Sequence, residues 1–408
     1  MSTINPFKIS VQDQQILQLR QRLELASWPD ELDGAEWDYG APLADIRRLA
    51  SYWKDGFDWR QQEEKLNGLP QFRTSIEVES FGSLDIHFVH QQSPVKSAIP
   101  LIFIHGWPGG FFECSKMLPL LTMGDADSPA FHVVAPSLPN FGFSEGVKKR
   151  GFGLAQHAEV CHKLMQKLGY QEYVTQGGDW GAGVSTVIRH LYPGACRANH
   201  LNTVYSSPPS FSKSPIVALQ HALTPYTEEE KQGLARTQAF QNEGFGYFHE
   251  QSTKPQTLGY ALADSPVALL AWIYEKLHDW TDAYPFTDDE ILTWISLYWF
   301  SRAGPAASIR LYYEFRHDRE WGYAGVGALG YAPRVVLGFS YMGHELSKNP
   351  RIWNRTQGPI VFESDHPDGG HFAVFEKPEL IAADLRAMFG RKGGAFGLIK
   401  GKDGHGLT

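Results

Sequence analysis

Three side chains stand out by their types and by their order along the chain: Asp179, Glu345 and His371. Each follows a run typical of a buried strand, namely YVTQG, RVVLGF and PIVFES. Because the carboxyl ends of parallel strands meet at one edge of a sheet, we expect the three side chains to lie close together. A carboxylate, a second acid and a histidine gathered in this way can serve as nucleophile, orienting group and base.

Asp179 lies at the bend of YVTQGGDWGAGVSTVIRHLYP, a stretch that begins as a strand and ends as a helix. Gly177 and Gly181 flank it, as small residues flank the serine of the G-x-S-x-G elbow, whose tight turn exposes one side chain above a parallel sheet. Here a carboxylate takes the place of that serine. Asp is also a preferred helix N-cap, so the local pattern alone leaves both roles open. The partners of Asp179 favour the nucleophile.

An oxyanion hole for this elbow is predicted from two backbone N–H groups. The residue after the nucleophile, Trp180, supplies one, and Trp107 in the HGWPGG loop after the apolar run PLIFI supplies the other. A literal G-x-S-x-G, GFSEG, places Ser144 at its centre. The strand run HVVAPS ends several residues before it and the basic turn VKKRG follows it, so we dismiss Ser144 as a nucleophile.

An aspartate nucleophile predicts an alkyl ester intermediate. Asp179 is ionised at neutral pH and attacks an sp³ carbon without help from a base. His371, oriented by Glu345, then activates the water that hydrolyses the ester. Halide and the oxygen of an epoxide are the two plausible leaving groups.

Tyrosines in the middle of the chain favour the epoxide, because a phenol can donate its proton to the departing oxygen. Tyr247 is one candidate, and the adjacent Tyr312 and Tyr313 are two more. Neighbours on a helix point about 100° apart, so only one member of this pair can face the pocket. Motif alignment favours Tyr312.

Composition limits the classes of partner. The chain has 408 residues, 42% of them hydrophobic, which is enough for a large core, and its formal charge of -8 argues against nucleic acid or an anionic membrane surface. Three widely spaced cysteines without a CxxC pair indicate a reduced compartment. No apolar run approaches the ~18 residues of a membrane helix. We therefore expect a soluble, cytoplasmic protein without a membrane anchor.

Strand and helix signals alternate on both sides of a helical, aromatic-rich stretch. This pattern, with the order nucleophile, acid, histidine, predicts an α/β-hydrolase fold: a mostly parallel sheet flanked by helices, with an inserted helical cap. The expected parts are an N-terminal extension (1–95), the first part of the core (96–205), the cap (206–330), the second part of the core (331–392) and a flexible, glycine-rich tail (393–408).

From Pro6 to Phe389 the chain resembles epoxide hydrolases of the microsomal and juvenile-hormone branch, including soluble fungal and bacterial members. The matching segments are PFKISVQDQQILQLRQRLELASWPDEL, HGWPG, GGDWG, GYFHEQSTKPQTLGYALADSPVALLAWIYEKL, YWFSRAGPAASIRLYYE, GFSYMGHEL and GGHFAVFEKPE. The resemblance implies conversion of small apolar epoxides to vicinal diols with water, no cofactor or metal, and a homodimer. It also implies that the N-terminal extension wraps the core and braces the cap.

The resemblance assigns roles to particular residues. Asp179 is the expected nucleophile, Tyr247 and Tyr312 are the expected donors to the epoxide oxygen, and Glu345 and His371 are the expected water-activating pair. Three further residues are expected to line the substrate pocket: His105, which we also expect to brace its loop, Pro108 and Phe372.

Other functions remain open at this point. A haloalkane dehalogenase would share the aspartate nucleophile and a tryptophan after it, and an inactive α/β-hydrolase could be a binding module. Asp365 or Asp368 could orient His371 in place of Glu345. A metal site built from Asp365, His366, Asp368 and His371 is disfavoured, because these residues lack the helical spacing of two histidines and a further ligand cluster.

Overall fold

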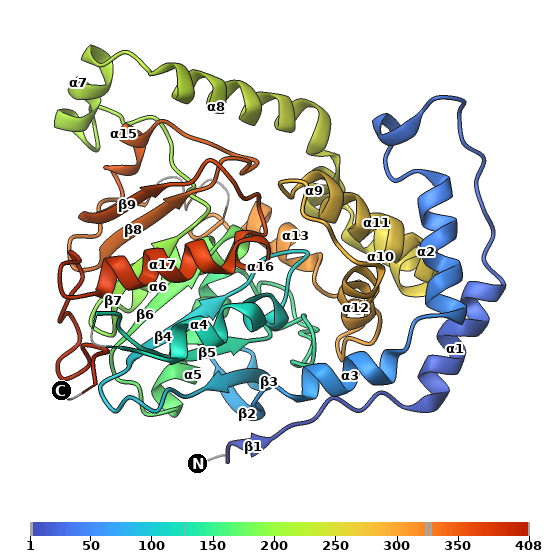
Figure 1. Cartoon of the computed structure of the whole chain (residues 1–408). Coiled ribbons are helices and arrows are strands. Elements are labelled where there is room, and N and C mark those ends of the chain that lie inside the picture. The colour runs from blue at the N-terminus through green and yellow to red at the C-terminus, as the bar shows by residue number, and fades with distance from the viewer. Residues whose placement is uncertain (1–2, 126, 323–324, 326–328, 407–408) are drawn as a thin grey trace.

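The computed structural model of the chain describes residues 3–125, 127–322, 325 and 329–406. The apolar runs form one nine-stranded sheet in the order β1-β2-β3-β5-β4-β6-β7-β8-β9 (Figure 1). From β5 to β9 all neighbours are parallel, whereas β1, β2, β3 and β5 pair antiparallel. The strands are β1 (Asn5–Pro6), β2 (Gln71–Val78), β3 (Gly82–Gln91), β4 (Ile99–Ile104), β5 (Phe131–Pro136), β6 (Tyr173–Gly177), β7 (Cys196–Leu201), β8 (Val336–Tyr341) and β9 (Ile360–Asp365).

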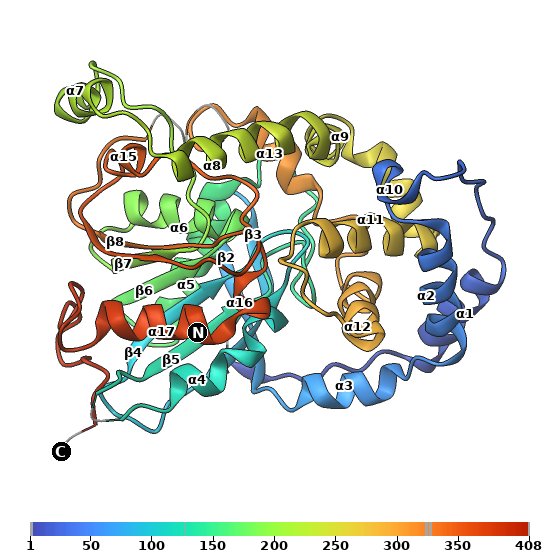
Figure 2. The same cartoon turned by 45° about the horizontal axis from the view of Figure 1, so that its top comes forward.

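Helices cover both faces of this sheet, as Figures 1 and 2 show. One face carries a pair of helices that pack on each other, α5 and α6, and the opposite face carries α4 and α17. The predicted α/β-hydrolase fold is confirmed. The core helices are η2 (Phe111–Lys116), α4 (Leu118–Thr122), α5 (Leu154–Lys167), α6 (Asp179–Leu191), α15 (Arg351–Asn354), α16 (Ala373–Glu376) and α17 (Pro378–Phe389).

A run of helices separates β7 from β8 and forms the cap beside the carboxyl edge of the sheet (Figure 1). In both views α7 lies beside α15, and α8 leads from there towards α9 (Figure 2). The cap helices are α7 (Pro215–Leu223), α8 (Glu228–Ala239), η3 (Phe240–Gly244), α9 (Gly246–Thr253), α10 (Pro255–Asp264), α11 (Pro266–Asp279), α12 (Asp288–Trp299) and α13 (Arg310–His317).

The N-terminal helices pack against the cap. They are α1 (Asp13–Glu24), η1 (Glu36–Tyr39), α2 (Leu43–Asp55) and α3 (Trp59–Asn67). The indole of the buried Trp53 donates to Ser296 Oγ at 3.0 Å, and Tyr52 donates to Asp289 Oδ1 at 2.9 Å. Both bonds join α2 to α12.

The C-terminal segment differs from the mobile tail we expected over 393–408. Ala395 and Ile399 are buried, Gly404 N–H donates to Ser97 O at 2.8 Å, and Gly404 O accepts from Ala130 N–H at 2.8 Å. The glycines allow left-handed turns that fold this segment back onto the core, with φ of 80° at Gly404. Glycine content alone therefore did not indicate mobility. Residues 407 and 408 lie outside the described part of the chain.

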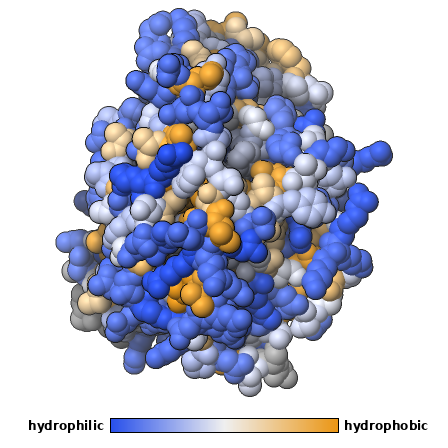
Figure 3. Space-filling model, turned by 90° about the vertical axis from the view of Figure 1, so that its right-hand side faces the viewer, coloured by the Kyte–Doolittle hydropathy of each residue, from blue (hydrophilic) through white to orange (hydrophobic). Residues whose placement is uncertain are grey.

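Within the described residues, no helix combines the length and the apolar character that crossing a bilayer requires. On the face formed by the right-hand side of Figure 1, apolar residues occur in several small groups separated by polar ones (Figure 3).

Close packing at the start of α6 gives a test of the fold. A Cβ added at Gly181 would lie 1.8 Å from the carbonyl oxygen of Ile104, so the backbones of β4 and α6 must separate in Gly181→Ala. We expect a loss of about 3 kcal/mol or more in the free energy of unfolding, measured by chemical denaturation. A Cβ at Gly194 meets nothing within 4 Å, so Gly194→Ala is the matched control, expected within about 0.5 kcal/mol of wild type. Equal stability of the two variants would contradict this packing.

Candidate active site

Asp179 is held at a sharp turn between β6 and α6. Its φ of 48° lies in the left-handed region, which is costly for a residue with a side chain and is tolerated where the surroundings enforce it. Gly178 makes room for the turn, because a Cβ there would lie 2.6 Å from Asn202 Nδ2. The structure thus builds the predicted elbow with an aspartate at its apex.

One carboxylate oxygen of Asp179 lies in the predicted oxyanion hole. The backbone N–H of Trp107, in the loop after β4, donates to Asp179 Oδ1 at 2.7 Å. Of the two N–H groups expected there, only that of Trp107 bonds to this carboxylate among the described residues. The other carboxylate oxygen of Asp179, Oδ2, remains available to react. It accepts a long hydrogen bond of 3.4 Å from the hydroxyl of Tyr205, a residue that the sequence did not indicate.

His371 and Glu345 meet beside Asp179. His371 Nδ1 lies 2.7 Å from Glu345 Oε1, and His371 Nε2 lies 3.6 Å from Asp179 Oδ2. Glu345 is fixed by two more donors, Thr203 Oγ1 at 2.7 Å and its neighbour Leu346 N–H at 2.8 Å. Both acceptor oxygens of Glu345 are therefore engaged, so this acid orients the ring and leaves Nε2 facing the nucleophile.

The charges of neighbouring groups determine whether His371 and Glu345 are protonated. Burial alone lowers the pKa of His371, but the carboxylates of Glu345 and Asp179 outweigh it and raise that pKa well above its ordinary value. Burial alone would raise the pKa of Glu345, but the charge of His371 and the bonds from His371 and Thr203 lower it. In the resting protein His371 is therefore an imidazolium between two carboxylates.

Two cap tyrosines approach the core from α9 and α13. The rings of Tyr247 and Tyr312 are buried, with centroids 5.8 Å apart, and lie 5.5 and 5.6 Å from the ring of Trp107. Burial, foremost, raises the pKa of both phenols well above the ordinary value, so both carry protons. Tyr313 instead stacks on His317 at 4.0 Å, away from this cluster. Tyr312, and not Tyr313, therefore lines the cavity that contains Asp179.

These groups share a cavity of about 350 Å³. Its lining includes the candidate catalytic residues and apolar rings from both core and cap. The lining residues are Leu154, Asp179, Trp180, Gly183, Thr203, Tyr205, Ser206, Ser207, Thr237, Phe240, Gln241, Phe245, Tyr247, Phe248, Tyr312, Phe315, Glu345, Leu346, Ser347, Asn349 and His371. A nucleophile, a base and two hydroxyl donors therefore face one largely aromatic space.

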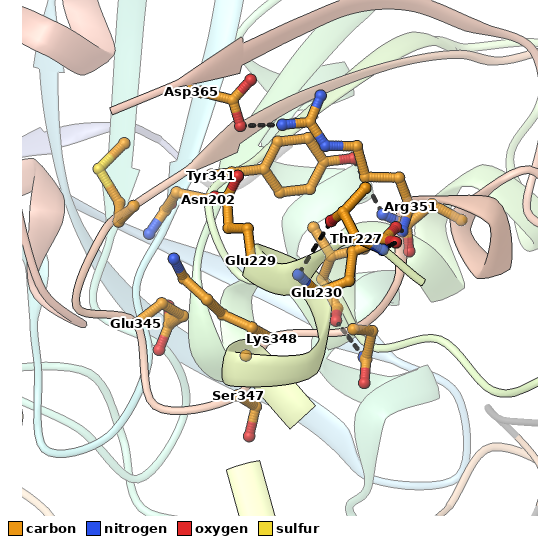
Figure 4. A pocket seen from close by; sticks show the side chains of 15 residues that line it. Asn202, Thr227, Glu229, Glu230, Tyr341, Glu345, Ser347, Lys348, Arg351 and Asp365 are labelled. Carbon is orange, nitrogen blue, oxygen red and sulfur yellow. Dashed lines mark hydrogen bonds and ion pairs between the residues drawn. The ribbon is translucent and has the colours of Figure 1, made fainter. Parts of the chain in front are cut away.

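A second cavity of about 270 Å³ borders the loop that carries Glu345 (Figure 4). Charged side chains from α8 and α15 line it, and Arg351 pairs there with Asp365. Neither Asp179 nor His371 is part of its lining. The aromatic cavity, and not the charged one, therefore contains both Asp179 and His371.

His105, Pro108 and Phe372 lie elsewhere than we expected, since none of them lines the aromatic cavity. His105 braces its loop, because Nδ1 bonds Gly106 O at 2.9 Å and Nε2 accepts from Leu138 N–H at 3.1 Å. The carbonyl of Pro108 accepts from the indole of Trp294, and the ring of Phe372 stacks on that of Trp280. His105 and Phe372 instead line a smaller space beside Asp179 and His371.

The residues of the alternative sites bond to other groups instead. Ser144 is fully buried, and its hydroxyl donates to Ser137 O at 2.7 Å. It is therefore not exposed above the sheet as the nucleophile of an elbow is. Asp365 pairs with Arg351, and His366 Nε2 bonds Asp384 Oδ2 at 2.7 Å. Across the described residues, no group of three histidine, cysteine or acidic side chains converges as metal ligands would.

The loop that carries His371 is fastened directly to the cap, which the sequence did not indicate. His371 N–H donates to Trp280 O at 2.7 Å. The carboxylate of Glu376 accepts from the N–H groups of Gly370 at 3.2 Å and Phe372 at 3.0 Å. It also accepts from the backbone N–H of Asp282 in the cap at 2.8 Å. These acceptors fix the backbone on both sides of the histidine.

The protonation of His371 is testable in the resting protein. We expect the imidazolium to persist above the ordinary pKa of about 6.5, because two carboxylates stabilise it. Asp179→Asn removes one of the two charges, so the pKa of His371 should fall. Nitrogen NMR of histidine-labelled protein reads both states. His105 is the internal control, because burial lowers its pKa to about 4. An unchanged titration in Asp179→Asn would count against this charge pairing.

Two family models and several known proteins match this chain. Residues 4–114 match the model described as "Epoxide hydrolase N terminus", and residues 99–255 match "alpha/beta hydrolase fold". The chain is 36% identical over 416 residues to "Epoxide hydrolase 1" of Oryctolagus cuniculus, covering 95% of this chain and 89% of that protein. It superimposes on the structure of Aspergillus niger epoxide hydrolase with a TM-score of 0.80 at 34% identity, covering 94% and 95% of the two chains. For juvenile hormone epoxide hydrolase of Bombyx mori the TM-score is 0.84 at 30% identity, covering 94% and 93%. The chain belongs to the epoxide hydrolase family.

Proposed function

We propose that this enzyme converts small apolar epoxides to vicinal diols through a covalent ester on Asp179. The observation that carries the proposal is the meeting of Asp179, the pair His371–Glu345 and the hydroxyls of Tyr247 and Tyr312 at one aromatic cavity. A carboxylate nucleophile with hydroxyl donors opposite it suits an sp³ carbon bonded to an oxygen leaving group.

The first step is alkylation. Asp179 Oδ2 attacks a ring carbon, the carbon–oxygen bond of the epoxide breaks, and its electron pair stays on the oxygen. Tyr247 and Tyr312 donate hydrogen bonds to that oxygen, and one of them transfers the proton that makes the alcohol. Their high pKa values keep the protons in place until the oxygen becomes strongly basic.

The second step is ester hydrolysis. Alkylation neutralises Asp179, and His371 thereby loses one of the two charges that hold its proton. Its proton then passes to the tyrosinate left by the first step. As a neutral ring, His371 accepts a proton from water at Nε2 while the water oxygen attacks the ester carbonyl. The developing charge falls on Oδ1, where the N–H of Trp107 donates at 2.7 Å. Collapse releases the diol and restores the carboxylate.

The cavity also limits the substrate. Its volume of about 350 Å³ and its lining of phenylalanine, tryptophan and leucine side chains suit a small apolar epoxide with room for one bulky substituent.

The covalent step is tested by removing the base. In His371→Gln, reaction with styrene oxide should leave an ester that is not hydrolysed, and mass spectrometry should show the added substrate mass on the peptide that contains Asp179.

The wild-type enzyme in ¹⁸O water gives the complementary test. One turnover should place the label in the carboxylate of Asp179, because water attacks the ester carbonyl. Label found only in the diol would rule out the ester.

The tyrosine donors are tested by substitution. Tyr247→Phe and Tyr312→Phe should each slow alkylation by about 10-fold or more, and the double variant by about 10³-fold, because no donor then stabilises the departing oxygen. Stopped-flow or rapid-quench measurement of ester formation reads this step. Tyr313→Phe is the matched control, since its ring stacks on His317 and should leave the rate unchanged. Slowing in the control equal to that in Tyr312→Phe would reverse the assignment.

A further inference from the structure

A small space borders the nucleophile. Its volume is about 20 Å³, and Asp179, His371 and Glu113 are among its lining residues. A void of more than about 10–15 Å³ holds one water when two or more polar groups face it. This space therefore fits one water molecule and no substrate fragment.

His371 also lines this space. His371 Nε2 is buried and has no hydrogen-bond partner among the described residues, because Asp179 Oδ2 is 3.6 Å away. Its other nitrogen is already bound to Glu345. A buried polar atom without a partner is costly, so a water there would satisfy it.

Glu113 brings a second polar group to the same space. Its carboxyl is 6% exposed, and Oε1 accepts from Gly110 N–H at 2.7 Å. A Cβ at Gly109 would lie 1.9 Å from Oε1, so only glycine at that position leaves room for the carboxyl. The spacing of Gly109 and Glu113 in HGWPGGFFE thus brings the carboxyl of Glu113 next to the loop that carries Trp107. Glu113 lines the small space and not the aromatic cavity.

We propose that Glu113 positions the hydrolytic water, holding it between its carboxyl group and His371 Nε2 for attack on the ester of Asp179. This inference rests on the proposed two-step function. Nothing in the first step requires the water, so the role of Glu113 belongs to the second step alone.

In the resting enzyme Glu113 is uncharged at neutral pH. Burial, foremost, and the nearby charge of Asp179 raise the pKa of Glu113 to about 8, against the opposing effects of Gly110 N–H and His371. At neutral pH the group is a carboxylic acid that can both donate to water and accept from Gly110. An amide has the same size and the same donor and acceptor pattern, whereas an alkyl group has neither.

The test separates the two steps by rapid quench and intact-protein mass spectrometry with styrene oxide. We expect Glu113→Leu to slow ester hydrolysis by about 10- to 100-fold and to accumulate alkylated enzyme, with alkylation within about threefold of wild type. We expect Glu113→Gln to restore hydrolysis to within about tenfold of wild type, because the amide still binds water.

A purely structural role of Glu113 predicts a different result, since a displaced loop would move Trp107 and slow both steps equally. Equal slowing of both steps, unchanged hydrolysis in Glu113→Leu, or a Gln variant as slow as the Leu variant would overturn the inference. If Glu113→Leu does not fold, Gly109→Ala takes its place, because the added Cβ displaces the same carboxyl and should slow the same step. Absence of any ester in both wild type and His371→Gln would overturn the proposed function as well, and so is distinguishable.

Discussion

The negative charge of Asp179 is the feature on which the rest of the site depends. It lies in a largely apolar cavity, 3.6 Å from His371 Nε2, and is balanced by that imidazolium and one backbone N–H. While the charge is present it holds a proton on His371 and on the buried tyrosines. In the proposed reaction alkylation removes the charge, and the same histidine becomes a base only then. One carboxylate thus orders the two steps in time, because the base cannot act before the ester exists.

The site is assembled from both core and cap, so their relative placement must be fixed. Helix α12 makes the connection: Trp294 and Tyr298 donate to the carbonyls of Pro108 and Gly109 in the oxyanion loop. The same helix accepts the indole of Trp53 from the N-terminal segment at Ser296. The N-terminal helices therefore act on the catalytic loop through one intermediate helix. This arrangement gives the extension a physical function, since a shift of α12 would move the backbone around Trp107.

The sequence predicted those parts of the site that have local signals. Asp179 lies between a strand run and a helix run, Glu345 and His371 follow strands, and chain order related the three. The divergence of neighbours on a helix limited the tyrosine choice to one of Tyr312 and Tyr313, and motif alignment selected Tyr312. Thr203, Glu113 and Glu376 were missed because each acts through a contact with a backbone or side chain of another segment, and no periodicity or spacing marks such an acceptor. The buried C-terminal segment was missed for the same reason, since its hydrogen bonds join Gly404 to Ser97 and Ala130.

The two buried acids next to the catalytic histidine differ in how many donors they have, and this difference separates their roles. Burial raises the pKa of Glu376 to about 7, against three backbone N–H groups that favour its ionised form. Glu113 accepts one, and its pKa reaches about 8. Three donors tie Glu376 to the backbone on both sides of the histidine, whereas Glu113 has one donor and more free acceptor positions beside an adjoining void. In the proposed reaction, which consumes one water per turnover, that capacity points to the water.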